Sequence, residues 1–345
     1  MKNNKKTKLP AKRKLIIAAT VVAVILILII SVFVFFNDIL NDINRLPSNN
    51  GFENLEQLEG VDPDGEIVEK DPVVEEAEKI LNSKNVINIL LVGQDRRSNE
   101  VDENARTDSM ILCTVNLSKN TLTMTSFMRD MWVYIPDHYN SRINSAYMLG
   151  GFDLLNKTLE YNFGASGEYN IEIDFSGFME LVDSIGGVDV ELTAAEAKYL
   201  NRRGNWDIEQ NCDWELVKGV NRLTGSQALA YSRIRQIGDD FERTNRQRTV
   251  LTAMIDKAKT LGFTETYRLV RSAISLISTD MTNTEIMALA MALLPKLDTL
   301  EIVSQRIPAD GEYSFATKPS GASVIELSPK NFEANKKLLI TAMEE

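Results

Sequence analysis

The stretch from Tyr231 to Arg248, YSRIRQIGDDFERTNRQR, concentrates side chains that bind anions. A guanidinium group stays charged at any working pH and matches two phosphate oxygens with parallel hydrogen bonds. In a chain with a net charge of −11, so dense a group of arginines indicates a phosphate site. Read alone, the segment also fits a solvated helix face whose arginines pair with neighbouring aspartates. Five arginines fall within these 18 residues: Arg233, Arg235, Arg243, Arg246 and Arg248.

Further charged groups lie at the ends of three strand-like runs. Asp95 ends VINILLVGQD, Asp108 opens DSMILCTVNL, and Arg129 follows TLTMTSFM. In open α/β sheets, ligands bind beyond the carboxyl ends of strands. Carboxylates at neighbouring strand edges are hard oxygen ligands suited to Mg²⁺ or Mn²⁺. Each group alone is a weak signal, because aspartates and arginines at strand ends are usually turn residues or members of ion pairs.

From Val86 onward, strands alternate with helices, and these elements must position the charged groups. VINILLVGQD is a continuous apolar run typical of a buried strand, and the next two runs are joined by a turn at 118–120. This alternation predicts an α/β sandwich in a single domain over 86–345. The remaining predicted elements are a helix over 152–161, a strand and helix in IEIDFSGFMELVDSIGG, a strand in VDVEL, helices in LTGSQALAYSRIR and TNRQRTVLTAMIDKAKTLG, helices near 264–278 and 282–296, a strand near 299–307 and a helix near 329–343.

The N-terminal region predicts a membrane anchor. Residues 15–36, LIIAATVVAVILILIISVFVFF, form 22 residues without a charge, enough for a helix to span a hydrocarbon core of about 30 Å. The run is too long for the apolar part of a cleaved signal peptide. Residues 1–14 carry seven lysines and arginines and no acid, so we expect a cytoplasmic tail and place the remainder outside the cell.

Residues 37–85 are predicted to form an acidic extracellular stalk. Their polarity and their prolines and glycines argue against a packed core, and their expected task is to hold the folded domain near the membrane. Outside the basic tail, the chain has 31 basic against 49 acidic residues.

Several classes of site lack their sequence signatures. Cys113 lies in the apolar run MILCTV, where a buried thiol is the default, although a disulfide with Cys212 stays open. His138 is the single histidine, in a predicted loop, and no CxxC motif occurs. No phosphate loop of the GxxxxGK[ST] type, GxGxxG after the first strand, GxSxG or HExxH occurs either.

Seven motifs over residues 86–260 together resemble the LytR–CpsA–Psr family of bacterial cell-envelope enzymes. They are INILLVGQDRR, RTDSMIL, MTSFMRDMWVYIP, INSAYMLGGFDLLNKTLEYNFG, DFSGFMELVDSIGGVDVEL, LTGSQALAYSRIR and DFERTNRQR. The resemblance implies an α-β-α sandwich around a mixed central sheet, preceded by one transmembrane helix. The implied topology is that of a single-pass protein of the cell membrane with a cytoplasmic N-terminus and an extracellular catalytic domain.

The resemblance implies a phosphotransferase that moves an anionic glycopolymer, of the teichoic acid or capsular polysaccharide type, from an undecaprenyl-pyrophosphate carrier to peptidoglycan. Its implied partners are that lipid-linked polymer, peptidoglycan and the lipid bilayer, with no nucleic acid. Asp95 and Asp108 would hold Mg²⁺ (or Mn²⁺), and the implied catalytic residues are Asp108, Arg129, Arg235 and Asp240. The implied pyrophosphate-binding residues are Arg106, Arg129, Arg233, Arg235, Arg243 and Gln247.

Two alternatives stay open, a third is disfavoured, and one choice of residue stays open. A pyrophosphatase acting on polyprenyl-pyrophosphate lipids would use the same site with water as acceptor. A non-catalytic scaffold that binds envelope glycans would not need the aspartate pair. A transcriptional regulator is disfavoured, because a tail of 14 residues is too short for a DNA-binding domain. Asp240 would orient an arginine or act as a base, although the adjacent Asp239 is the other candidate acid.

The apolar segments after the arginines suggest where a polyprenyl tail could lie. TVLTAMIDKA, SAISLIS and EIMALAMALLPKL are predicted to wall an apolar tunnel that opens near Arg233 and Arg235. Flexible methionines suit a deformable pocket, although ordinary core packing explains any one segment equally well. The methionines concerned are Met254, Met281, Met287 and Met291.

Overall fold

The computed structural model describes residues 43–46, 85–94, 107–202, 213–261, 273–318 and 321–344. The chain divides into two compact units, Met1–Ile43 and Asn44–Glu345, and the elements below belong to the second. The predicted tail (1–14) and transmembrane helix (15–36) lie outside the described residues, as does most of the predicted stalk. Within the described ranges, no helix combines the length and apolarity needed to cross a membrane.

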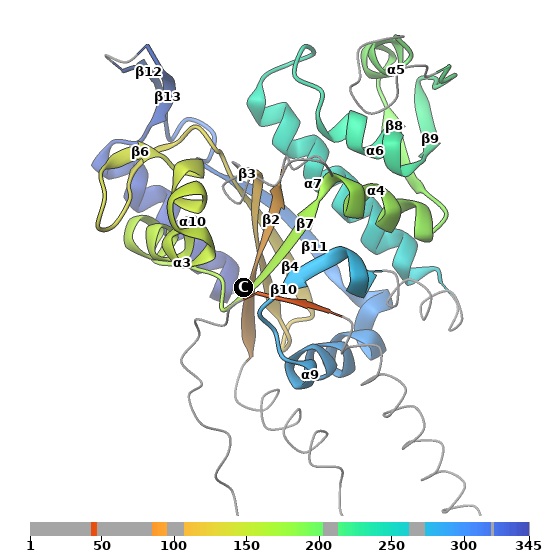
Figure 1. Ribbon diagram of the computed structural model, residues 1–345, viewed down its shortest axis with the longest axis horizontal. Coiled ribbons are helices and arrows are strands. Elements are labelled where there is room, and N and C mark those ends of the chain that lie inside the picture. Colours follow the sequence, from red (N-terminus) through yellow and green to blue (C-terminus); the bar gives the residue numbers. More distant parts are fainter. Residues whose placement is uncertain are drawn as a thin grey trace, which may run out of the picture. The chain divides into compact units, whose positions relative to one another are not determined.

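Within the described residues, seven strands form one mixed central sheet (Figure 1). Across the sheet they run in the order β1 (Asn44–Arg45), β10 (Ile277–Thr279), β7 (Tyr169–Asp174), β2 (Val86–Gln94), β3 (Thr107–Asn116), β4 (Thr121–Phe127) and β11 (Glu301–Ile307). β2 pairs in parallel with β7 and antiparallel with β3, and β4 pairs antiparallel with β3 and in parallel with β11. Because β2 and β3 lie in the middle of the sheet, both of their faces are covered, which explains their continuous apolar runs.

Helices cover both faces of this sheet. On the left in Figure 1, α3 and α10 pack on a core that contains Leu90, Leu112 and Phe163. On the right lie α4, α6 and α7, and Leu251 and Ile255 of α7 pack against Ile111 on the opposite face of the sheet. The three layers agree with the predicted sandwich. The helices are α3 (Asn144–Phe163), α4 (Phe175–Ser184), α5 (Ala194–Leu200), α6 (Gly225–Ser232), α7 (Asp240–Lys259), α9 (Asn283–Leu293), the short 3₁₀ helix η1 (Leu294–Thr299) and α10 (Pro329–Glu344).

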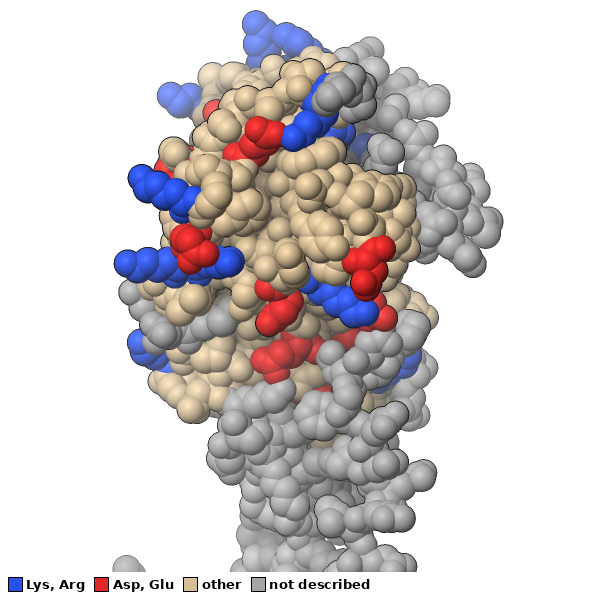
Figure 2. All heavy atoms as spheres, turned by 90° about the vertical axis from the view of Figure 1, so that its left-hand side faces the viewer, with Lys and Arg blue, Asp and Glu red and all other residues tan. Residues whose placement is uncertain are grey.

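Figure 2 looks onto the side of the molecule that α3 and α10 cover. Acidic side chains gather in the lower centre of this view around a basic one, and the other charged side chains of the described residues are scattered among uncharged ones. Outside the main sheet, short strands of the described residues pair into two-stranded sheets. They are β5 (Trp132–Tyr134) with β6 (Asn140–Arg142), β8 (Val188–Leu192) with β9 (Gly219–Leu223), and β12 (Ser314–Thr317) with β13 (Ser323–Glu326).

The structure corrects several sequence expectations. The helix predicted over 152–161 is the second half of α3, which begins at Asn144 and breaks at Gly150 and Gly151; Gly151 has φ of 59°, a conformation that glycine adopts readily. The helix predicted near 264–278 is wrong at 277–278, which belong to β10 (Ile277–Thr279), because Ile277 pairs with Ile173 of β7. Asn44–Arg45, in the predicted stalk, pairs with β10 as β1.

Cys113 and His138 lie as expected, the first as a buried thiol and the second outside helices and strands. Cys113 in β3 is a free thiol, and burial raises its pKa to about 12, so it is an inert core residue. Cys212 lies outside the described residues. His138 lies in the turn between β5 and β6.

Candidate functional site

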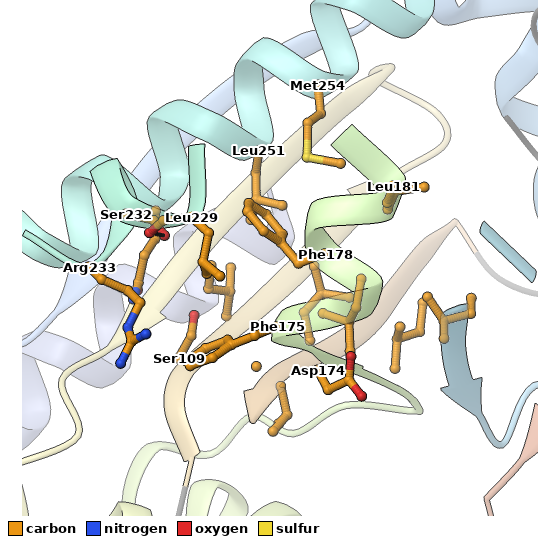
Figure 3. A pocket seen from close by; sticks show the side chains of 18 of the residues that line it. Ser109, Asp174, Phe175, Phe178, Leu181, Leu229, Ser232, Arg233, Leu251 and Met254 are labelled. Carbon is orange, nitrogen blue, oxygen red and sulfur yellow. Dashed lines mark hydrogen bonds between the residues drawn. The ribbon is translucent and has the colours of Figure 1, made fainter. Parts of the chain in front are cut away.

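An apolar pocket lies between the sheet and the helices on its right-hand face in Figure 1. Its volume is about 210 Å³, with β2, β3 and β7 on one side and α4, α6 and α7 around it. In Figure 3 the polar end with Ser232 and Arg233 lies opposite the apolar end with Leu181 and Met254. The apolar lining residues are Leu91, Val92, Ile111, Ile171, Ile173, Phe175, Phe178, Leu181, Leu229, Leu251, Met254 and Ile277.

Close packing of α4 against α6 holds one wall of this pocket. A Cβ at Gly225, the first residue of α6, would lie 2.1 Å from the carbonyl oxygen of Met179 in α4, so only glycine fits there. The amide of Gly225 also donates to the Asp183 carboxylate at 2.7 Å. Substitution of Gly225 would therefore separate two helices that line the pocket.

The polar end of the pocket contains residues that the sequence assigned to pyrophosphate. Arg233 is the C-cap of α6, and its guanidinium lies 4.5 Å from the ring centroid of Phe175, a cation–π distance. The pocket therefore joins an apolar interior to a cluster of guanidinium groups. The predicted pyrophosphate-binding residues that line the pocket are Arg233, Arg235, Arg243 and Gln247.

The register of α7 explains why Arg243 and Gln247 share the pocket. Residues 243, 247, 251 and 254 are separated by four, four and three positions, which places them on one face of a helix. α7 begins four residues before the helix that the sequence predicted from Thr244. Asp239 caps it, since its side chain accepts the amide of Glu242 at 3.0 Å.

Asp240 lies among the arginines. One carboxylate oxygen is 3.0 Å from Nη2 of Arg243 and 3.7 Å from Nη2 of Arg129, which follows β4 and also pairs with Asp130 at 3.4 Å. Burial raises the pKa of Asp240, against the opposing charges of Arg243 and Arg129. The two candidate acids thus have different surroundings, because Asp239 caps the helix and Asp240 contacts two predicted site arginines.

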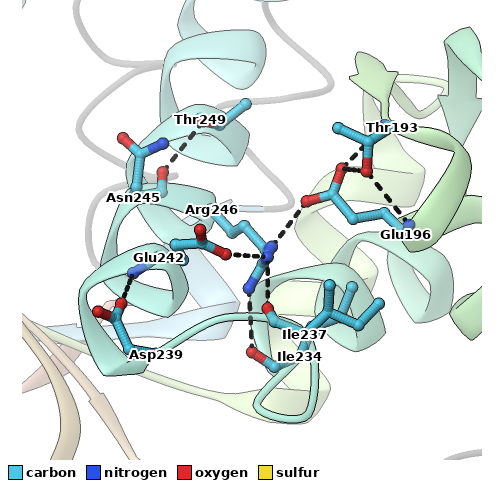
Figure 4. A network of polar contacts seen from close by, with 9 residues as sticks. All are labelled: Thr193, Glu196, Ile234, Ile237, Asp239, Glu242, Asn245, Arg246 and Thr249. Atoms are coloured by element: carbon cyan, nitrogen blue, oxygen red, sulfur yellow. Dashed lines mark hydrogen bonds and ion pairs between the residues drawn. The ribbon is translucent and has the colours of Figure 1, made fainter.

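Arg246 belongs to a buried network beside the site rather than to the pocket (Figure 4). Its Nε lies 2.8 Å from Glu196 of α5, and its two Nη groups donate to the carbonyls of Ile234 and Ile237 at 3.2 and 2.8 Å. A carboxylate oxygen of Glu242 also lies 3.0 Å from Nη2 of Arg246. The guanidinium therefore ties the loop that carries Arg235 to α7 and α5. This arginine neither lines the pocket nor lies on a solvated helix face, because it is buried and pairs with glutamates.

The predicted metal ligands are only partly covered. Asp95 lies outside the described residues, and Asp108 is described by its place in β3 and not by its side chain. Arg106, predicted to bind pyrophosphate, also lies outside the described residues. Among the described residues, no group of three or more histidine, cysteine, aspartate or glutamate side chains is arranged to hold a metal ion.

The residues next to those aspartates nevertheless fit a hard cation. β2 and β3 place Gln94 directly opposite Thr107. Oε1 of Gln94 and Oγ1 of Thr107 are buried and have no hydrogen-bond partner among the described residues. Buried oxygens without a proton donor are unfavourable, and they are the atoms that Mg²⁺ binds.

Some residues at the site were not singled out from the sequence. Nε2 of Gln94 donates to the Tyr147 hydroxyl at 2.9 Å, and that hydroxyl also contacts the Glu172 carboxylate. Phe175 lies under Arg233 at the start of α4. The junction between strand and helix in DFSGF was the available signal for Phe175, since ligands collect at such junctions.

Two of the three segments predicted to wall a tunnel contribute lining residues to this pocket. α7 contributes Leu251 and Met254, and Ile277 comes from the segment SAISLIS. No described lining residue of this pocket comes from α9, and Met281, Met287 and Met291 are not among them. α4 and α6 supply the remaining helical wall.

Fold and site together define an α/β protein in which a cluster of arginines lies at one end of an apolar pocket. The chain belongs to the LytR_cpsA_psr family, which matches residues 56–340.

Relatives within this family carry names of two kinds. The chain is 34% identical to the polyisoprenyl-teichoic acid–peptidoglycan teichoic acid transferase TagU of Bacillus cereus over 248 residues, 70% of this chain and 75% of the relative. It is 35% identical to the transferase TagT of Bacillus subtilis over 188 residues, covering 53% of this chain and 56% of TagT. Regulatory protein MsrR of Staphylococcus aureus is 34% identical over 169 residues, 49% of this chain and 48% of MsrR. The matches span only about half the length of TagT and MsrR.

Solved structures share the fold. TagT bound to LI-WTA has a TM-score of 0.61 and 27% identity, covering 76% of this chain and 92% of that one. The family protein YwtF (TagT) with bound octaprenyl pyrophosphate lipid has a TM-score of 0.57 and 26% identity over the same shares of the two chains.

Proposed function

We propose that this chain is a phosphotransferase that moves an anionic glycopolymer, of the teichoic acid or capsular type, from an undecaprenyl-pyrophosphate carrier to peptidoglycan. The observation that carries the proposal is the pocket, whose apolar interior ends at Arg233, Arg235 and Arg243. A lipid pyrophosphate needs both parts: an apolar wall for its tail and guanidinium forks for its head group. The transferase names of TagU and TagT, and the octaprenyl pyrophosphate in a related structure, support the same ligand class.

The chemistry proposed is a phosphoryl transfer. An acceptor hydroxyl oxygen forms a bond to the phosphorus that carries the polymer, the bond from that phosphorus to the bridging oxygen breaks, and polyprenyl phosphate leaves. Such reactions depend on positioning and charge neutralisation, which the arginines supply. Asp240 holds Arg243 and Arg129 in place, and its raised pKa also suits it to take the hydroxyl proton.

In this proposal Asp95 and Asp108 hold Mg²⁺ (or Mn²⁺). The buried oxygens of Gln94 and Thr107, which precede these aspartates in the sequence, support an oxygen-rich site at this edge of the sheet. When bound, the ion would neutralise charge on the phosphate oxygens.

The proposal also places the catalytic domain outside the cell, behind a single membrane anchor at 15–36. The motivation is the basic flank of that segment. Protease added to intact, wall-stripped cells should digest the domain; protection that ends only on lysis would contradict this orientation.

Transfer itself is tested with a labelled lipid-linked donor and the full chain in detergent, with and without peptidoglycan. Label that enters peptidoglycan supports the transferase. Release of polymer at equal rates without acceptor indicates the pyrophosphatase alternative. Binding without turnover under either condition indicates a glycan-binding scaffold.

A further inference from the structure

The opposite side of α7 carries a second cationic feature that the proposed reaction does not use. Two cavities, lined by described residues, lie along this side with volumes of about 710 and 460 Å³. Both are lined by Asn245, Arg248 and Ser304 of β11, and they share no lining residue with the apolar pocket. Arg248 therefore lies where the two cavities meet.

Arg248 is almost fully enclosed, with 6% of its side chain exposed. Nη2 donates to Asn245 at 3.3 Å, whereas Nε and Nη1 are buried and have no hydrogen-bond partner among the described residues. A buried guanidinium with donors left over is unfavourable unless something accepts those protons. Burial, together with the nearby charge of Arg306, lowers the pKa of Arg248 to about 10.

Arg306 supplies a second guanidinium on the same cavity wall. It lies 4.2 Å from the ring centroid of Phe241 and pairs with Asp310, while its Nη1 is buried without a partner among the described residues. Two like charges on one cavity wall repel each other, so the arrangement favours an anion that both can contact.

Acids also line the cavities, and three of them pair with cations outside the proposed site, whereas Asp310 pairs with Arg306 and Glu191 lines the larger cavity. Asp189 pairs with Arg222 at 2.9 Å. Glu242 pairs with Arg246 at 3.0 Å, and Asp256 pairs with Lys259 at 3.1 Å. Amide and hydroxyl groups of Asn245, Ser304 and Gln305 complete the lining beside the two arginines. Such a set of donors suits a phosphate-type oxyanion.

We propose that Arg248 and Arg306 form a second binding site for a phosphate-class oxyanion, separate from the arginines of the apolar pocket. Phe241 lines this site and directly follows Asp240, so the site begins beside the first turn of α7. A polymer with phosphodiester links can therefore be held at a second point while its end lies at the pocket. This polymer role rests on the proposed function, whereas anion binding itself does not.

The test is titration of the full chain in detergent with inorganic phosphate, by calorimetry. Arg235→Ala is included in every sample to weaken the first site. Arg248→Met keeps the buried apolar stem but removes the donors, and we expect phosphate affinity to fall at least tenfold. Arg222→Met is the matched control, since Arg222 lines the larger cavity but is 59% exposed and paired with Asp189; phosphate affinity should stay unchanged. Equal affinity in the Arg248→Met protein, or an equal loss in both variants, would overturn the site.

Two further measurements remain decisive if Arg248→Met fails to fold. Crystals of the Arg235→Ala protein soaked in selenate should give an anomalous peak between Arg248 and Arg306, and an empty map there would refute the proposal. Synthetic poly(glycerol phosphate) should compete with inorganic phosphate, whereas polyglutamate of equal charge should not. Phosphate binding without competition by poly(glycerol phosphate) would support the anion site and overturn its polymer role. These readouts require no transfer activity, so they fail or succeed independently of the proposed enzyme.

Discussion

The carboxylate of Asp240 lies 3.0 Å from Nη2 of Arg243, an arginine whose side chain is only 2% exposed. A buried guanidinium needs a compensating acceptor, and the carboxylate supplies one at the edge of the pocket. The pair therefore fixes a positive charge at the place where the apolar cavity ends.

Loss of the guanidinium fork at Arg235 should slow transfer strongly. A charge-assisted contact to the pyrophosphate is worth about 1.5–3 kcal/mol, so Arg235→Ala should lower kcat/KM by about 10–150-fold. Arg235→Lys should be nearly as harmful, because a lysine keeps the charge but not the bidentate geometry. We expect the same losses of activity for Arg129→Ala and Arg129→Lys. Wild-type turnover in folded Arg235→Ala protein would remove this residue from the site.

The raised pKa of Asp240 predicts how stability depends on pH. A carboxyl whose folded pKa exceeds its unfolded value binds protons preferentially in the folded state, so its contribution is present at low pH. That contribution is lost as pH rises from the ordinary value of 3.8 through the raised one. Asp240→Asn should therefore gain in unfolding free energy relative to wild type as pH rises from about 4 to 7. Urea unfolding at several pH values measures this, with the exposed Asp298→Asn as control; a flat difference for Asp240→Asn would contradict the shift.

The buried pair of Arg246 and Glu196 should matter more for stability than any exposed pair. Glu196→Ala removes the buried carboxylate from a guanidinium with 5% exposure and leaves it only the largely exposed Glu242. Breaking a buried pair outright costs about 3–5 kcal/mol, which is the upper bound for this variant. The exposed pair of Glu333 and Lys336 provides the control, since Glu333→Ala should cost less than about 1 kcal/mol. Urea unfolding compares the two variants. Because Arg246 also holds the loop of Arg235, Glu196→Ala should lower transfer activity even where the protein is folded.

Divalent metal should be required if Asp95 and Asp108 hold an ion. Excess EDTA should abolish transfer, and added Mg²⁺ or Mn²⁺ should restore it. Asp108→Ala should not recover at ordinary metal concentrations. Full activity in EDTA would contradict the metal site. A bound ion would then not account for the buried oxygens of Gln94 and Thr107 that lack hydrogen-bond partners among the described residues.

The elements with long local patterns were predictable from sequence, and those that depend on distant partners were not. β2, β3 and β4 have apolar runs that specify buried strands without reference to neighbours. By contrast, β10 has three residues and forms only because β7 lies beside it, and β1 depends in turn on β10. The first half of α3 was missed because Gly150 and Gly151 interrupt its pattern.

The arginine segment shows the same limit at the level of single side chains. The sequence indicated anion binding for the group as a whole, yet the arginines divide by helical face. Arg243 faces the pocket, Arg246 holds a loop, and Arg248 lies on the far side beside β11. Helical periodicity separates these positions only once the helix start is known, and the cap at Asp239 was not recognised as that start.

The apolar pocket predicts that donor affinity depends on the length of the polyprenyl chain. Each buried methylene contributes about 0.8 kcal/mol, or about fourfold in affinity, so each five-carbon isoprene unit that enters the cavity should strengthen binding by more than about tenfold at constant head group. Met254→Trp should shorten the accessible cavity, because Met254 lies at the end opposite Arg233 in Figure 3. We expect this variant to bind short-chain polyprenyl phosphates as wild type does and to gain less from longer ones. Fluorescence competition with a series of polyprenyl phosphates measures both effects, with the exposed Met291→Trp as control. Equal affinity of the wild-type protein for short and full-length chains would show that the tail does not enter this pocket.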